Sequence, residues 1–143
     1  MFGLLKSRSV VQLAGRARLE SVRSLAAAVQ TKSPEEMKKL VESDKVVLFM
    51  KGDRQQPMCG FSNVVVKVLE MHGIPYREYN VLEDESVRQG VKDFGDWPTI
   101  PQLYVNGKLV GGSDILVEMH QKGELPSFFK KEGLQSKLEE EKS

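Results

Sequence analysis

The sequence predicts one α/β domain with a mixed four-stranded sheet flanked by helices. Its 143 residues, 40% of them hydrophobic, are enough for a single packed core. Apolar runs of strand length alternate with segments in which apolar residues recur at helical spacing. The last two strands are joined by Asn106-Gly107, a pair that favours a type I′ hairpin turn because both central residues there need positive φ.

The first two predicted elements are a helix and a buried strand. The helix begins in "SPEEMKKLVESD", where Ser33 and Glu36 have the spacing of a capping box and Pro34 suits the first helical position. The run "KVVLFMK", residues 45–51, is continuously apolar between charged ends. Such a run is typical of a central strand that is covered on both faces.

A helix, a strand and a second helix are predicted next. From 59 to 72 apolar residues recur at helical spacing, and Gly73 is the expected end of that helix. "PYREYNV", residues 75–81, is strand-like. "DESVRQGVKDFG", residues 84–95, predicts a helix that ends at Gly95.

The C-terminal part predicts the hairpin and two more helices. "PQLYV" and "KLVGG" are its strands, and "SDILVEMHQKG" is a helix for which Ser113 is the candidate cap. "LPSFFKKEG" predicts one more short helix, and the charged tail 135–143 is expected to fray. The first two strands should be parallel and the last two antiparallel, which is the thioredoxin-like layout.

Residues 1–30 have the composition of a mitochondrial transit peptide. They hold five of the 21 basic residues but one of the 20 acidic ones, and they are rich in Ser, Ala and Leu. Cleavage is expected near residues 24–31, before a domain at 31–134 and the charged tail. A flexible basic arm that binds an anionic surface is the alternative interpretation.

Composition excludes several function classes. No apolar run approaches the ~20 residues of a membrane-spanning helix. The chain after residue 30 carries a slight net negative charge and no basic patch, so nucleic-acid binding is not expected. A single cysteine, Cys59, excludes an internal disulfide and an internal multi-cysteine metal site.

Cys59 is the strongest candidate for chemistry. It is expected at a helix N-terminus, where unpaired N–H groups and the helix dipole favour the thiolate, the nucleophilic and metal-binding form. Ser62 stands where a two-cysteine redox motif would have its second cysteine. An activated single thiolate can exchange with an external thiol or ligate a metal centre. An inert buried cysteine in an interaction domain is the structural alternative.

Three motifs in order resemble the monothiol glutaredoxins, which have a Cys-Gly-Phe-Ser active site. They are "KGDRQQPMCGFS", "WPTIPQLYVNG" and "GGSD", and the resemblance runs from about residue 34 to 133. With its basic N-terminal arm the chain is most similar to the mitochondrial glutaredoxin 5-like proteins. This resemblance implies a glutaredoxin with one redox-active cysteine in the mitochondrial matrix.

The resemblance implies a glutathione site beside the cysteine. Lys51 would pair with the glycine carboxylate of glutathione, with Arg88 near the same charge. The turn at Thr99-Ile100-Pro101 would have a cis bond before Pro101, and the Ile100 backbone would pair with the peptide. The implied glutathione-binding residues are Lys51, Cys59, Phe61, Arg88, Thr99, Ile100, Pro101, Gly112, Ser113 and Asp114.

The resemblance also implies a 2Fe-2S cluster held between two subunits. Such a cluster takes four ligands, and a homodimer would supply Cys59 from each subunit and one glutathione thiolate on each side. The implied function is transfer of the cluster to recipient apoproteins. The implied partners are an iron–sulfur scaffold, its chaperone, BolA-like proteins and those apoproteins.

Two alternative interpretations stay open, and the chain differs from the family pattern at two places. A glutathione-dependent oxidoreductase needs only Cys59 and a second glutathione, so enzyme activity stays open beside the carrier role. His72 and His120 each fall late in a predicted helix, and a ligand role for them is the weaker interpretation. Many relatives have a cysteine where this chain has Ser113, and the loop "GDRQQP" differs from the commoner family form.

Overall fold

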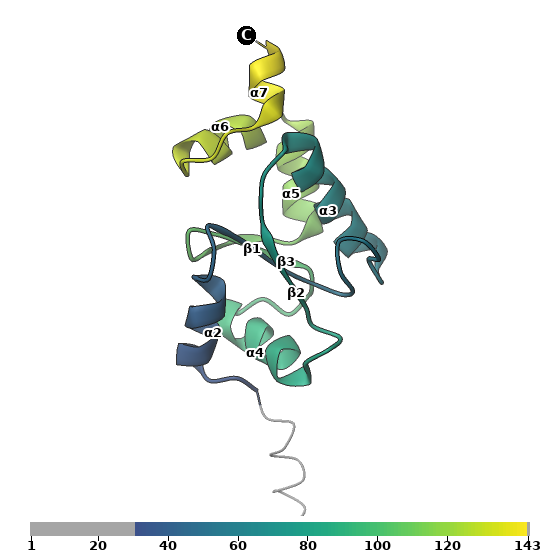
Figure 1. Ribbon diagram of the computed structural model, residues 1–143, viewed down its shortest axis with the longest axis vertical. Coiled ribbons are helices and arrows are strands. Elements are labelled where there is room, and N and C mark those ends of the chain that lie inside the picture. The colour runs from purple at the N-terminus through teal and green to yellow at the C-terminus, as the bar shows by residue number, and fades with distance from the viewer. Residues whose placement is uncertain (1–30, 143) are drawn as a thin grey trace, which may run out of the picture. The chain divides into compact units, whose positions relative to one another are not determined.

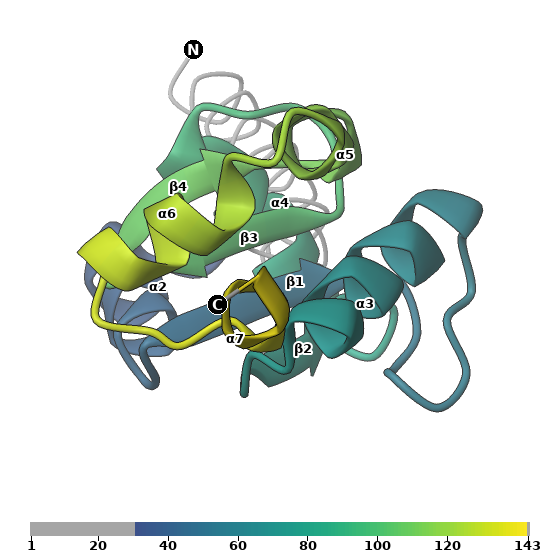
Figure 2. The same ribbon diagram turned by 90° about the horizontal axis from the view of Figure 1, so that it is seen from above.

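The computed structural model describes residues 31–142, so the predicted transit peptide lies outside the described part of the chain. Four strands form one sheet in the order β2-β1-β3-β4, and Figure 2 labels all four. Strand β1 (Val46–Met50) is parallel to β2 (Arg77–Asn80) and antiparallel to β3 (Gln102–Val105), which forms a hairpin with β4 (Lys108–Gly111). The mixed sheet that the sequence predicts is therefore confirmed.

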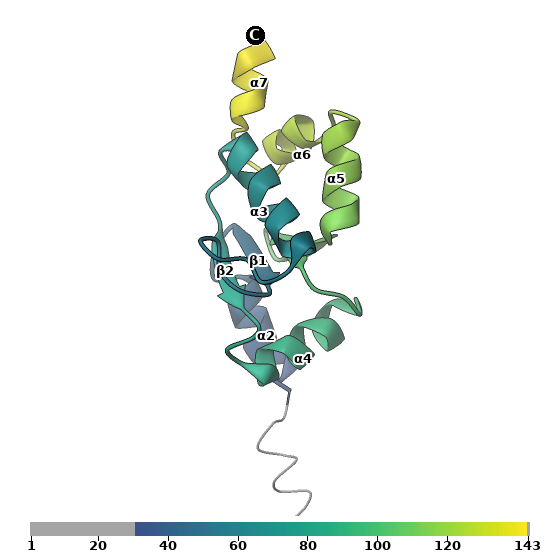
Figure 3. The same cartoon turned by 90° about the vertical axis from the view of Figure 1, so that its right-hand side faces the viewer.

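Helices cover both faces of the sheet. Helices α3 (Gly60–His72), α5 (Ser113–Gln121) and α6 (Leu125–Lys131) lie on one face, as Figures 1 and 3 show. Helices α2 (Pro34–Val41) and α4 (Glu85–Gly95) pack together on the other. A last helix, α7 (Lys137–Lys142), lies at the C-terminal end of α3 (Figure 2).

Strand β1 is the centre of both halves of the core. All five of its residues are buried, and successive side chains point to opposite faces. Val46, Leu48 and Met50 belong to the cluster under α3, α5 and α6, and Val47 and Phe49 to the cluster under α2 and α4. This two-sided burial explains why the strand is continuously apolar in sequence.

Local signals set the ends of several elements as predicted. Ser33 and Glu36 form the expected capping box at α2. Gly73 ends α3 in the left-handed conformation, with φ 66°. The hairpin turn has positive φ at Asn106 (51°) and Gly107 (78°), as a type I′ turn requires.

Two expectations differ from the structure, the cap at Ser113 and the frayed tail. Ser113 is not a cap but the first residue of α5, because Gly112 holds the cap position with extended backbone. Helix α4 ends at Gly95, as predicted, and the C-cap residue Asp96, with a φ of 47°, supplies the left-handed turn after it. The tail predicted to fray instead contains α7.

A buried histidine contacts the segment that precedes α7. His72, at the end of α3, is 1% exposed, and its Nδ1 lies 2.7 Å from the hydroxyl oxygen of the fully buried Ser136. Its Nε2 lies 3.0 Å from Nδ1 of His120 on α5. The two histidines therefore pair with each other and with the segment before α7. Among the described residues no helix is long and apolar enough to cross a membrane.

Candidate functional site

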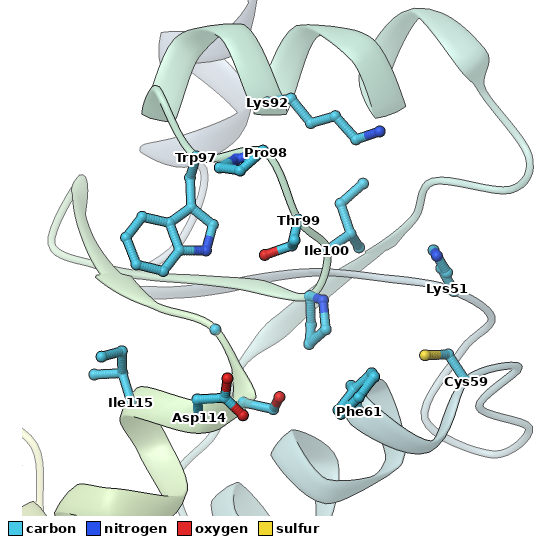
Figure 4. Close-up of a pocket in the computed structure, with 13 residues that line it drawn as sticks. Lys51, Cys59, Phe61, Lys92, Trp97, Pro98, Thr99, Ile100, Asp114 and Ile115 are labelled. Atoms are coloured by element: carbon cyan, nitrogen blue, oxygen red, sulfur yellow. The ribbon is translucent and has the colours of Figure 1, made fainter.

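A pocket of about 590 Å³ lies where β1 and β3 meet the first turns of α3 and α5 (Figure 4). It brings together residues from segments that are far apart in the sequence. Nine of the ten predicted site residues line it: Lys51, Cys59, Phe61, Thr99, Ile100, Pro101, Gly112, Ser113 and Asp114.

The thiol of Cys59 lies at the mouth of this pocket. Cys59 is the N-cap residue of α3, with extended backbone, and its half-buried side chain makes no capping hydrogen bond. Helix α3 has no acidic residue in its first turn to occupy its N–H groups. A Cβ built on Gly60 would meet no atom within 4 Å beyond the two neighbouring residues and the backbone of its own helix, so the space next to Cys59 on this side is open. The position thus favours a reactive thiolate.

Ser62 joins the helix to the central strand. Its side chain is fully buried, and its hydroxyl oxygen accepts a hydrogen bond from the Lys51 backbone N–H at 3.1 Å. The carbonyl oxygen of Lys51 in turn accepts from the Met58 N–H at 2.9 Å. These two bonds hold Lys51 next to the segment that carries the thiol.

The loop between them, residues 52–58, is fastened to β2. Gly52 N–H donates to Oδ1 of Asn80 at 2.9 Å. The backbone N–H and Nε of Arg54 both donate to the carboxylate of Glu78. The guanidinium also donates to the carbonyl oxygen of Tyr76 at 2.8 Å and lies 4.1 Å from the centre of its ring. Arg54 is therefore the main anchor of this loop.

The start of α5 forms the opposite wall. Its cap residue Gly112 has no side chain to satisfy the N–H groups of the first turn. Within residues 31–142 the backbone N–H groups of Ser113 and Asp114 have no hydrogen-bond partner. Such a helix start attracts a carboxylate or another anion. The exposed Asp114 side chain also lines the pocket and offers an acceptor to a cation.

The third wall is the segment from Trp97 to Pro101. The Ile100–Pro101 peptide is cis, as the resemblance implies. Ile100 is 6% exposed, and no hydrogen bond among the described residues uses its N–H. A buried N–H without a partner is costly, so this donor is available to an extended peptide bound in the pocket.

The pocket also contains residues that the sequence interpretation missed. They are Lys92, Trp97, Pro98 and Ile115. Lys92 lies one helical turn after Arg88 on α4, and this spacing was the available signal for it. Trp97 opens the motif "WPTIPQLYVNG", for which the resemblance implies no role at that position.

Arg88 is the one predicted residue that does not line the pocket. Its Nη1 lies 3.7 Å from Oε2 of Glu85 in the preceding turn, and its side chain is 36% exposed. The neighbouring acid thus holds the guanidinium along the helix. Its role toward a ligand remains a prediction.

A metal centre would need ligands from outside one chain. Among the described residues no group of three or more His, Cys, Asp or Glu side chains is placed to hold a metal ion. His72 and His120 are paired with each other away from the pocket lining. Cys59 is thus the single candidate metal ligand at this site.

Comparison with known proteins agrees with this geometry. Residues 46–110 match the Glutaredoxin family. The chain is 54% identical to the "Glutaredoxin-related protein 5, mitochondrial" of Danio rerio over 87% of its own length and 76% of that protein. It is 45% identical to the "Monothiol glutaredoxin-5, mitochondrial" of Lachancea kluyveri, over 87% of this chain and 89% of that one.

Solved structures support the thioredoxin-like fold. The structure of reduced apo GrxS14 from poplar is 47% identical and has a TM-score of 0.61, over 68% of this chain and 90% of that one. Shared sequence and shared topology thus cover the sheet and the pocket together.

Proposed function

Because the chain belongs to the monothiol glutaredoxin family, we propose that it carries a glutathione-ligated 2Fe-2S cluster and transfers it to apoproteins in mitochondrial iron–sulfur cluster assembly. One observation carries the proposal. The chain's single cysteine stands at a helix N-terminus beside a pocket, and Ser62 occupies the place of a second thiol. A single open thiolate can ligate a shared metal centre but cannot close an internal disulfide.

Glutathione is the proposed co-ligand. The Lys51 ammonium would bind its glycine carboxylate, with Arg88 turned from Glu85 toward the same charge. The Ile100 backbone, between Thr99 and Pro101, would pair with its main chain. At the other end the N–H groups at Gly112, Ser113 and Asp114 would bind the γ-glutamyl carboxylate, and the Asp114 carboxylate its ammonium. Phe61 would cover the cysteinyl part.

The cluster is cargo in this proposal. Two subunits would each supply Cys59, and two glutathiones would supply the other two thiolates. Met58 and Phe61, on either side of the thiol, are each 62% exposed. Large apolar side chains this exposed are typical of interaction surfaces, and we propose that a second copy of the chain covers them in the cluster-bridged homodimer.

The proposed place is the mitochondrial matrix. Two of the relatives above carry "mitochondrial" in their names, and residues 1–30 have a transit-peptide composition. The proposed division is thus transit peptide 1–30, glutaredoxin domain 31–134 and charged C-terminal tail 135–143. The proposed partners are the assembly scaffold with its chaperone, BolA-like proteins and recipient apoproteins. Removal of residues 1–30 should leave the chain outside mitochondria in an import assay.

A glutathione-dependent oxidoreductase is the second candidate, because the half-buried thiol is reachable from solvent. The Cys59 thiolate would attack the glutathione sulfur of a mixed disulfide, and the target thiolate would leave. The thiolate of a second glutathione would then attack that same glutathione sulfur, release Cys59 and form glutathione disulfide. Each step exchanges one S–S bond for another, so no further oxidant or reductant is needed.

Anaerobic reconstitution of the full chain with iron, sulfide and glutathione tests the proposal. We expect about one 2Fe-2S cluster per dimer, read by visible absorbance, circular dichroism and mass, and dependent on glutathione. Cys59→Ser should lose the cluster, whereas Ser127→Ala, exposed on α6, should keep it. No cluster in the unaltered chain, with rapid turnover of a glutathionylated peptide, would favour the oxidoreductase.

A further inference from the structure

Gln102 is a buried polar residue behind the pocket wall. It lies on β3, is 0% exposed and does not line the pocket. Its side-chain NH₂ donates to the carbonyl oxygens of Trp97 at 2.8 Å and Thr99 at 3.2 Å. Its side-chain oxygen accepts from the Tyr104 hydroxyl at 2.9 Å. Both protons and the oxygen of the amide therefore have partners.

The segment that Gln102 holds has no regular structure of its own. Residues 97–101 connect α4 to β3, and all five line the pocket. The N–H of Trp97 bonds to the carbonyl oxygen of Lys92 at 3.1 Å, which fastens the segment to the end of α4. The two Gln102 bonds fasten it to the sheet. The attachment of this wall to the sheet is thus made by one buried amide.

The surrounding residues make room for this network. A Cβ added at Gly95 would lie 2.5 Å from the Tyr104 hydroxyl oxygen and 3.0 Å from the Gln102 side-chain oxygen. Gly95 has no positive φ within the described set, so close approach is what favours glycine there. The ordinary pKa of tyrosine, near 10, already keeps the hydroxyl protonated at physiological pH, and burial raises the pKa of Tyr104 further, to about 12.

An apolar residue would be expected at this place if packing alone mattered. Burying an amide gives little net stability, whereas leaving it without partners is costly. Gln102 and Tyr104 are alternate residues of β3 and therefore point to the same face of the sheet. Tyr104 belongs to the core cluster under α2 and α4. The buried pair Gln102 and Tyr104 is thus best explained by the attachment of the Trp97–Thr99 segment to the sheet.

We propose that Gln102 is a positioning residue, which fixes the Trp97–Thr99 wall so that a bound glutathione main chain can lie against it. The amide acts through the backbone of that wall and does not touch the ligand. This inference rests on the proposed function, since it requires glutathione in the pocket. It names a determinant of ligand affinity that lies outside the pocket.

Glutathione titration of the full chain, followed by NMR, tests it. Gln102→Met keeps the length and removes both donors, and Tyr104→Phe is the matched control that leaves these donors in place. We expect Gln102→Met to raise the glutathione dissociation constant at least tenfold and Tyr104→Phe less than threefold. Alkylation of Cys59 by iodoacetamide should stay within twofold in both, which a general loosening of the fold would not allow.

Several outcomes would overturn the inference. Unchanged glutathione binding by folded Gln102→Met would do so, as would equal losses in the two variants. If Gln102→Met does not fold, amide exchange in the unaltered chain decides. The Gln102 side-chain NH₂ must then be protected from exchange with and without glutathione. If the unaltered chain binds no glutathione, the proposed function fails first, and the inference with it.

Discussion

The backbone N–H of Lys51 donates a 3.1 Å hydrogen bond to the hydroxyl oxygen of Ser62, joining the end of β1 to the first turn of α3. The residue that stands in place of a second thiol thus links the central strand to the helix that follows the cysteine. A hydroxyl does this better than a thiol because sulfur is a weak acceptor.

Ser62→Cys should therefore add internal disulfide chemistry at some cost in stability. We expect an oxidised form two mass units lighter, with Cys59 joined to the new thiol, and a loss of about 1 kcal/mol in the free energy of unfolding. Mass spectrometry after mild oxidation and urea unfolding measure both. Ser62→Ala should show the stability loss alone, and two independently glutathionylated thiols in Ser62→Cys would contradict the prediction.

Lys51→Glu should weaken glutathione binding at least tenfold. The change replaces an attraction for the glycine carboxylate with a repulsion inside a half-enclosed pocket, where screening is reduced. Lys67→Glu, exposed on α3, carries the same charge change away from the pocket and is the control. Equal effects of the two variants in a glutathione titration would mean that only net charge matters.

Arg54→Ala should loosen the loop before the thiol without unfolding the domain. The Arg54 side chain is 40% exposed, so its ion pair with Glu78 contributes no more than about 1 kcal/mol. Hydrogen exchange in residues 52–58 should nevertheless become several-fold faster, because the anchor to β2 is lost. Gln55→Ala, exposed in the same loop, should leave the exchange unchanged. Unaltered exchange in Arg54→Ala would assign the anchoring to Asn80 instead.

His72 should make the domain less stable in acid. Burial, and then the nearby His120, lower the pKa of His72 in the folded state below its ordinary value near 6.5. The unfolded chain therefore binds the proton first, and stability falls as the pH drops below about 6.5 toward the folded pKa, by at most about 1.4 kcal/mol per pH unit. Urea midpoints at pH 7.5 and 5.5 measure this loss.

His72→Phe supplies the comparison for that measurement. It should reduce the difference between the two pH values, although it removes the contact with Ser136 and lowers stability at both. A difference as large as in the unaltered chain would assign the acid sensitivity to other groups.

The parts of the fold that sequence predicted are those with local causes. The continuous apolar run of β1, the capping box at Ser33 and the Asn106-Gly107 turn each depend on a few adjacent residues. Helix α7 follows Ser136, which contacts His72, 64 positions away. No local sequence pattern predicts that contact. The prediction that Ser113 caps its helix is wrong because the preceding residue, Gly112, has the extended backbone of the cap position.

The residues of the site likewise fall into those that the sequence predicts and those that it does not. Cys59 and its neighbours form one short motif, and the resemblance to a family predicts both this motif and most of the remaining pocket residues. Gln102 reads in sequence as an ordinary strand residue, since its partners become visible only when the turn at Trp97 folds back over β3. Resemblance alone predicts a ligand role for Arg88, which lies 3.7 Å from Glu85 and does not line the pocket.

Gly60 has a consequence for how variants of this protein would be ranked. A Cβ there would meet no atom within 4 Å beyond the two neighbouring residues and the backbone of its own helix, and glycine is a poor helix former. A screen that scores folding alone would thus accept most residues at Gly60, whereas a screen that scores access to the thiol would reject the larger ones. At Gly52, where φ is 87° and a Cβ would collide with backbone, both screens would agree. Positions at which the two screens disagree are therefore those where a small residue preserves access of reactants to the sulfur.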